Sequence, residues 1–89
     1  MWGLLTGAWE LDPQVALRPE PFGALAYHYG NRRLTFLRSP DFVELVQSLG
    51  EYASVDEALA ASPIQPTRWP SVQRALAALA DSEVIRPRG

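Results

Sequence analysis

The amino-acid sequence predicts an α+β domain in which a three-stranded antiparallel sheet comes first and three helices follow. Between residues 17 and 38, alternating side chains flank the dipeptide Gly30-Asn31, a pattern typical of a β-hairpin. After residue 39, apolar residues recur at intervals of three and four, which indicates amphipathic helices. The last strand of the hairpin therefore has no later strand with which to pair.

Size and composition limit the class of protein. A domain of 89 residues hides only about 60–65% of the surface of its unfolded chain. An apolar content of 47% argues for a packed globule rather than disorder, and the absence of cysteine excludes disulfides and thiolate metal sites. Residues 1–13 form an apolar lead-in without the features of a targeting or membrane-spanning segment, and residues 14–89 form the domain. We expect a cytoplasmic protein.

The three strands are expected at residues 14–18, 22–29 and 33–37. Pro19 and Pro21 should end the first strand, because proline cannot donate a hydrogen bond to a sheet. A turn at Gly30-Asn31 places residue 27 opposite residue 34 and residue 25 opposite residue 36, whereas a turn one residue later pairs 27 with 36 and 29 with 34. Both registers stay open at this point.

The two faces of this sheet differ in composition. In either register one face carries Leu25, Tyr27, Leu34 and Phe36, which we expect to face the core. The opposite face is mostly small or polar and is expected to point outward. It carries Ala24, Ala26, His28, Arg33, Thr35 and Leu37.

Helix signals follow in sequence order. Ser39-Pro40-Asp41 begins the first helix, whose apolar stripe is Phe42, Leu45, Val46 and Leu49, and Gly50 ends it. A capping box at residues 54–57 opens a second helix through residue 61. A third helix runs from residue 69 to residue 80, with Trp69, Val72, Leu76 and Leu79 inward, and Val84-Ile85 closes the core. Three helices with a small sheet suggest a winged-helix-like unit.

Residues that could support catalysis are missing from the sequence. His28 is the single histidine and has no second ligand or base partner, so we expect it to pack at the surface or edge of the sheet. The glycines are scattered and form no phosphate-binding loop. We expect a protein that is not an enzyme and that holds no metal and no cofactor.

Nucleic-acid binding is the main alternative function. The helix count suits a small winged-helix DNA-binding regulator, but the net charge is −2, and the third helix offers only Arg68 and Arg74. The hairpin also precedes the helices, whereas the wing of such regulators usually follows them. We therefore expect neither a nucleic-acid partner nor a membrane partner.

The third strand has an open edge that is not blunted internally, because its charges lie at its ends. The third helix or the lead-in could cover this edge. The functional alternative is that an extended peptide adds a fourth strand, with side-chain pockets between residues 33–37 and the third helix. Arg33 and Arg38 would then favour an acidic peptide. Dimerisation through the edge strand or the N-terminal segment also stays open.

The runs ALRPEPFGALAYHYGNRRLTFLRSPDFVELV and TRWPSVQRALAALADSEVIRPR resemble the peptide chaperone of the mycofactocin biosynthetic system over residues 14–88. They are less closely similar to the chaperone of pyrroloquinoline quinone biosynthesis and to other precursor-peptide recognition elements. The resemblance implies a non-catalytic protein that binds the leader of a ribosomally made precursor peptide and presents it to a radical S-adenosylmethionine enzyme. Residues 1–13 lie outside the resemblance.

The resemblance also implies where the leader binds. In the family, the leader pairs with the third strand and lies against the third helix. This carries over to Arg33, Leu34, Thr35, Phe36 and Leu37, with Arg38 at the end of the strand. On the helix side it carries over to Arg68, Val72 and Ala75. An iron–sulfur cluster would belong to the partner enzyme, in keeping with the absence of cysteine from this chain.

Overall fold

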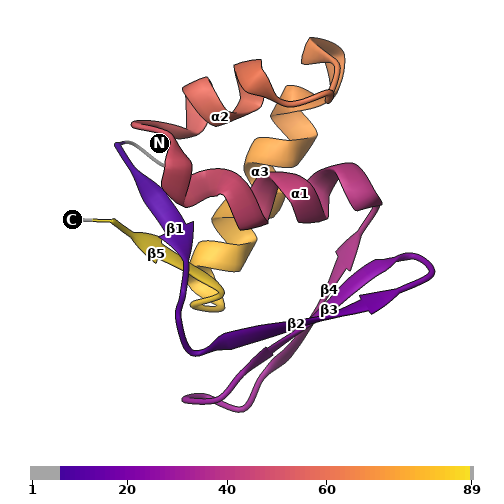
Figure 1. Ribbon diagram of the computed structural model, residues 1–89, viewed down its shortest axis with the longest axis vertical. Coiled ribbons are helices and arrows are strands. Elements are labelled where there is room, and N and C mark those ends of the chain that lie inside the picture. Colours follow the sequence, from indigo (N-terminus) through magenta and orange to yellow (C-terminus); the bar gives the residue numbers. More distant parts are fainter. Residues whose placement is uncertain (1–6, 89) are drawn as a thin grey trace.

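The computed structural model describes residues 7–88 and confirms the α+β class (Figure 1). The strands are β1 (Trp9–Leu11), β2 (Val15–Glu20), β3 (Gly23–His28), β4 (Leu34–Arg38) and β5 (Ile85–Pro87). The helices are α1 (Pro40–Ser48), α2 (Val55–Ala61) and α3 (Trp69–Asp81), with the short 3-10 helices η1 (Leu49–Glu51) and η2 (Pro66–Arg68). The helices lie on one side of the sheet formed by β2, β3 and β4 (Figure 1).

The central sheet has the strand order β2-β3-β4. Tyr27 pairs with Leu34, and Leu25 pairs with Phe36, as in the first of the two predicted registers. The expected two-residue turn is wrong, however. Residues 29–32 form the loop, the Arg32 N–H donates to the carbonyl oxygen of His28 at 2.7 Å, and the left-handed φ of 63° belongs to Arg32. The longer loop keeps the register because His28 still lies opposite Arg33, as it would with the two-residue turn.

Strand β2 is longer than predicted. It continues through Pro19 to Glu20, with Pro19 opposite Ala24. Proline is tolerated here because β2 is the outer strand of the sheet and needs hydrogen bonds on one side only. Pro21 lies in the turn to β3, so the predicted break comes two residues later than expected.

The predicted orientation of the sheet is wrong. Ala24 and Ala26 are 1% exposed and Leu37 is fully buried, whereas Leu34 and Phe36 are 61% and 62% exposed. Helix α1 packs against β3 and β4 on the buried side. The small alanine side chains explain the choice of face, because they let the helix approach the strands closely enough for Leu37 to enter the core. The larger apolar side chains are left on the solvent side.

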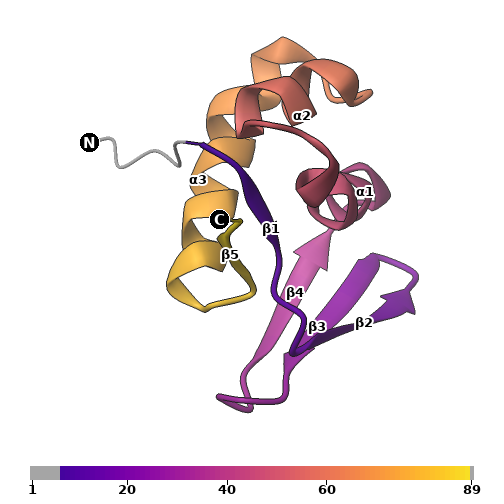
Figure 2. The same ribbon diagram turned by 60° about the vertical axis from the view of Figure 1, so that its left-hand side comes forward.

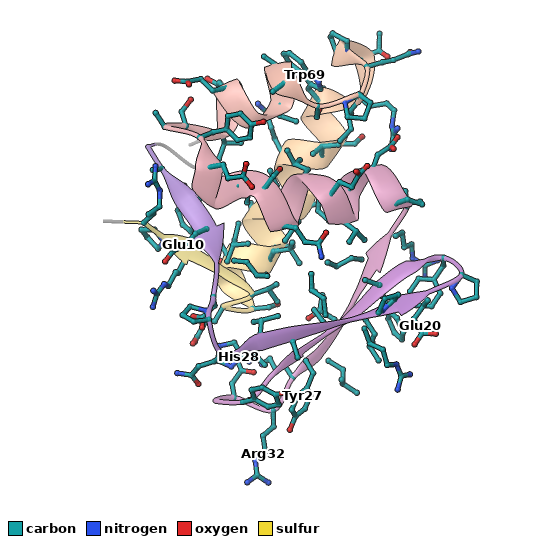
Figure 3. All side chains as sticks on the ribbon, in the orientation of Figure 1. Glu10, Glu20, Tyr27, His28, Arg32 and Trp69 are labelled. Carbon is teal, nitrogen blue, oxygen red and sulfur yellow. The ribbon has the colours of Figure 1, made fainter. Side chains whose placement is uncertain are left out.

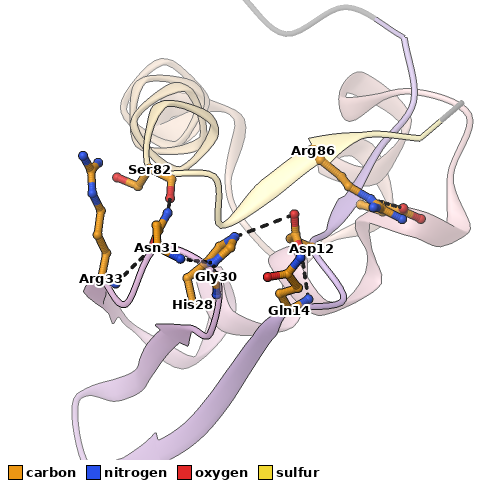
Figure 4. Close-up of polar contacts among 9 residues, drawn as sticks. Asp12, Gln14, His28, Gly30, Asn31, Arg33, Ser82 and Arg86 are labelled. Carbon is orange, nitrogen blue, oxygen red and sulfur yellow. Dashed lines mark hydrogen bonds and ion pairs between the residues drawn. The ribbon is translucent and has the colours of Figure 1, made fainter.

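The ends of the chain form a second sheet that was not predicted. Strands β1 and β5 pair antiparallel, with Trp9 opposite Pro87 and Glu10 opposite Arg86. The Arg86 Nε also donates to the Glu10 carboxylate at 2.8 Å (Figure 4). Part of the predicted lead-in is thus built into the fold, while residues 1–6 lie outside the described residues.

The helices form as predicted and supply most of the core. Ser39 and Ser54 cap α1 and α2, accepting from the N–H groups of Phe42 and Glu57. The core gathers the inner stripes of all three helices and the inner face of the sheet. Its fully buried large side chains are Leu37, Leu45, Val46, Leu49, Leu59, Leu76, Val84 and Ile85.

His28 lies inside the molecule, contrary to prediction, with an exposed fraction of 4%. Its Nδ1 accepts hydrogen bonds from the N–H groups of Gly30 and Asn31 at 3.0 and 3.1 Å. The Asn31 side chain in turn donates to the carbonyl oxygen of Ser82, directly after α3, at 3.2 Å (Figure 4). These bonds order the hairpin loop and hold the start of β4 beside the end of α3.

Candidate peptide-binding site

Strand β4 is an edge strand, as predicted. Within residues 7–88, no strand pairs with the side of β4 that faces away from β3. The β1–β5 pair forms a separate sheet and leaves this edge open. Figure 2 shows β4 at the edge of its sheet, running from the hairpin loop up to α1.

The hydrogen bonds of the hairpin identify the free backbone groups on β4. The N–H of His28 donates to the carbonyl oxygen of Arg33 at 3.1 Å, and the N–H of Ser39 donates to that of Phe22 at 2.8 Å. In an antiparallel pair, the backbone groups of one strand point alternately toward and away from the partner strand. The backbone groups of residues 35 and 37, the C=O of Arg33 and the N–H of Ser39 therefore point to β3. The N–H and C=O groups of Leu34, Phe36 and Arg38 point to the open side.

A groove of about 360 Å³ lies between the C-terminal end of β4, at Phe36 and Arg38, and helix α3. Apolar side chains of both helices form much of its wall, namely Phe42 on α1 and Val72 and Ala75 on α3. Its remaining lining residues are Phe36, Arg38, Ser39, Arg68 and Ser71. The groove thus combines an apolar interior with a rim of hydroxyl and guanidinium groups, beside open backbone hydrogen-bonding groups.

Five of the nine residues predicted for peptide binding line this groove. They are Phe36, Arg38, Arg68, Val72 and Ala75. Leu34 contributes its open-edge backbone groups, while Thr35 and Leu37 have the opposite orientation, and Leu37 is fully buried. Arg33 is exposed at the start of the strand, and its N–H donates to the Asn31 side chain at 2.9 Å.

Three lining residues were not predicted as part of the site: Ser39, Phe42 and Ser71. The sequence did identify Phe42 and Ser39, but as a core residue and a helix cap. Both roles are confirmed, since Phe42 is only 8% exposed and the Ser39 side chain accepts from the Phe42 N–H at 3.3 Å. The position of Ser39 and Phe42 directly after β4 in the sequence could have placed them in the site, because a helix that starts directly after an edge strand brings its first turn to that edge.

Positive charge surrounds the edge of β4. Arg68 Nη1 lies 3.8 Å from the Asp41 carboxylate, and both side chains are about half exposed, at 49% and 43%. Within the described residues, Arg33 and Arg38 take part in no ion pair. Two free guanidinium groups and one weakly paired group thus favour an anionic partner here.

A second groove, of about 310 Å³, lies between α1, η1 and α2. Its charged lining residues are Glu44 and Glu51, and it borders no open strand edge. Neither groove contains a cluster of metal ligands, because residues 7–88 hold no group of three or more His, Cys, Asp or Glu side chains that could bind a metal ion. The β4 groove is therefore the better candidate for binding an extended chain.

None of the helices in the described part of the chain has the length and apolar character needed to cross a membrane. The buried stripe of α3, with Val72, Leu76 and Leu79, is committed to the core. DNA binding would therefore depend on two exposed arginines, Arg74 on α3 and Arg68 directly before it, in a chain whose net charge is −2.

Comparison with known proteins identifies the family. The profile of the peptide chaperone MftB family matches residues 8–86. The peptide chaperone MftB of Mycobacterium tuberculosis is 37% identical, covering 99% of this chain and 97% of its own length. That of Mycolicibacterium smegmatis is 41% identical over 90% of this chain and 78% of its own length, and that of Mycobacterium ulcerans is 40% identical over 90% and 73%. No solved structure matches this chain.

The family match includes β1, the hairpin and the helices, and it begins at residue 8, so it reaches into the lead-in that the predicted resemblance left out. The matches confirm the predicted resemblance and the prediction of a non-catalytic protein, because the family is one of peptide chaperones. The chain belongs to the peptide chaperone MftB family of the mycofactocin system.

Proposed function

We propose that this chaperone binds the leader of a ribosomally made precursor peptide as a fourth strand on β4. It then presents the leader to a radical S-adenosylmethionine maturase in mycofactocin biosynthesis. The observation that carries the proposal is the coincidence of an open backbone edge with an apolar groove at the same end of β4. Strand addition uses main-chain hydrogen bonds for affinity and pockets for alternate side chains for specificity.

The geometry of β4 defines how the leader lies. Its backbone bonds to the N–H and C=O groups of Leu34, Phe36 and Arg38, which offer up to six hydrogen bonds. Every second side chain of the leader then points toward α3 and enters the groove beside Val72 and Ala75. The groove selects apolar side chains at those positions.

The arginines around the edge add a preference for acidic residues. Arg38 lies at the end of β4, Arg68 lies across the groove, and Arg33 is at the start of the strand. A leader carboxylate near Arg38 gains a charge-assisted hydrogen bond without displacing another acid, because Arg38 has no ion pair within the described residues. The preferred leader is therefore acidic, with apolar side chains at alternate positions.

Filling the groove tests this proposal. Ala75→Phe places a ring among the lining residues, whereas Ala78→Phe makes the same change at an exposed position of α3 outside the groove. Titrating a synthetic leader peptide by isothermal calorimetry should show at least about tenfold weaker binding to Ala75→Phe, equivalent to about 1.4 kcal/mol, and unchanged binding to Ala78→Phe. Equal affinity for both variants would place the leader elsewhere.

A further inference from the structure

The face of the central sheet directed away from the helices is unusually apolar. It carries the large hydrophobic side chains that are most exposed in residues 7–88. These are Phe22 at 39%, Tyr29 at 62%, Leu34 at 61% and Phe36 at 62%. Figure 3 shows Tyr27 of the same face projecting away from the helices. We refer to this surface, with the half-buried Leu25 and Tyr27, as the outer sheet face.

The strand register makes the outer sheet face continuous. One row across the sheet is Arg18, Leu25 and Phe36, and the next is Ala16, Tyr27 and Leu34. Edge-to-face ring contacts extend both rows, because Phe22 lies 5.6 Å from Phe36 and Tyr29 lies 5.2 Å from Tyr27 between ring centroids. Scattered exposed hydrophobic residues need no explanation, but a contiguous apolar patch of this kind marks an interaction surface.

Basic residues surround this patch. Residues 14–39 hold four arginines against Glu20 alone among acids, a formal charge of +3 in a chain whose net charge is −2, and three of the four lie on this side, since Arg33 belongs to the opposite face. Glu20 is already neutralised by Arg18, whose Nε lies 2.7 Å from its carboxylate. Arg32 projects from the hairpin loop on the same side as Tyr27 (Figure 3), and Arg38 follows Phe36 along the strand. The complementary surface is apolar at its centre and acidic at its rim.

A second copy of this chain does not meet that requirement. Two outer sheet faces packed together would set one basic rim against another. Two β4 edges paired about a two-fold axis at Phe36 would place Arg38 of each copy opposite Leu34 of the other, which brings both Arg38 side chains onto the same joined face. The charge therefore selects a different protein.

We propose that the outer sheet face docks the enzyme that receives the presented peptide, through an acidic-rimmed apolar surface of that enzyme. This inference rests on the proposed function. A leader paired with β4 would extend the outer sheet face by one strand, and its outward side chains would lie beside Leu34 and Phe36. The enzyme would then contact chaperone and leader together, and it binds the loaded chaperone more tightly than the free one.

Two variants remote from the β4 edge test this inference. Tyr29→Ser removes an exposed ring from the hairpin loop, and Ala16→Glu places a carboxylate on β2, the strand farthest from β4. Ala61→Ser, at an exposed position of α2, is the control. For each variant, circular dichroism checks the fold and calorimetry measures the affinity for the synthetic leader. Surface plasmon resonance then measures the affinity for the radical S-adenosylmethionine enzyme of the same system, with and without leader.

We expect about tenfold or greater loss of enzyme affinity in Tyr29→Ser and Ala16→Glu, with leader affinity within about twofold of the unmodified chain. Wild-type binding to the enzyme should weaken as salt is raised and strengthen when leader is present. Unchanged enzyme affinity in both folded variants would overturn the inference while leaving leader binding intact. Failure of the wild-type chain to bind leader would instead count against the proposed function. Dimerisation of the wild-type chain that Ala16→Glu abolishes would assign the face to a second copy.

Discussion

Two leucines on β4 provide a matched test of which side of the sheet faces the core. Leu37→Ala removes a side chain that is fully buried, whereas Leu34→Ala makes the identical change at a position that is 61% exposed. Truncating a buried leucine to alanine costs about 3 kcal/mol on average, because the lost transfer free energy is joined by the cost of the cavity. Leu34 has only about two-fifths of its surface removed from water, so its truncation should cost about 1 kcal/mol or less.

Urea unfolding followed by tryptophan fluorescence and circular dichroism measures the difference. We expect Leu37→Ala to lower the free energy of unfolding by about 2–3 kcal/mol more than Leu34→Ala, with the dependence on urea unchanged. For a domain of this size, the difference corresponds to a gap of roughly 10–20 °C in melting temperature. Equal losses, or a larger loss for Leu34→Ala, would refute the assignment of the buried face.

Two further predictions concern the edge and the hairpin. Charge reversal in Arg33→Glu or Arg38→Glu should weaken binding of an acidic leader severalfold in calorimetry at low salt. Arg88→Glu should leave that binding unchanged, although it alters the net charge equally, and similar losses in all three variants would mean that only net charge matters. Gly23→Ala should destabilise the domain by about 1–3 kcal/mol in urea, because Gly23 has φ +148° and an added Cβ would collide with the Leu37 carbonyl oxygen. An unchanged unfolding midpoint would contradict that close approach.

The helices could be read from the sequence, and the strand register could be narrowed to two alternatives, because their signals are local. The capping serines, the apolar stripes and the hairpin turn each act within a few residues. The choice of sheet face is not local. Leu25, Tyr27, Leu34 and Phe36 form the more hydrophobic face, but Ala24 and Ala26 allow α1 to pack on the other. Close approach of a helix outweighed hydrophobicity, and a count of apolar residues could not reveal that.

Other features depend on contacts between distant parts of the chain. Strands β1 and β5 are three residues each and lie at opposite ends of the chain, so neither has a periodic signal of its own. The candidate site was predicted in part, because an edge strand can be recognised from strand order alone. The groove also needs η2 and α3, which lie about thirty residues further along the chain, so their position beside β4 depends on the packing of the whole domain.

Hydrogen exchange along β4 tests strand addition most directly. The N–H groups of Leu34, Phe36 and Arg38 point to the open side, whereas those of Thr35 and Leu37 are directed to β3. With saturating synthetic leader, we expect exchange at residues 34, 36 and 38 to slow by at least about tenfold in NMR, with little change at residues 35 and 37, because a fourth strand would bond to alternate residues. Saturable leader binding without this alternating protection would contradict the account.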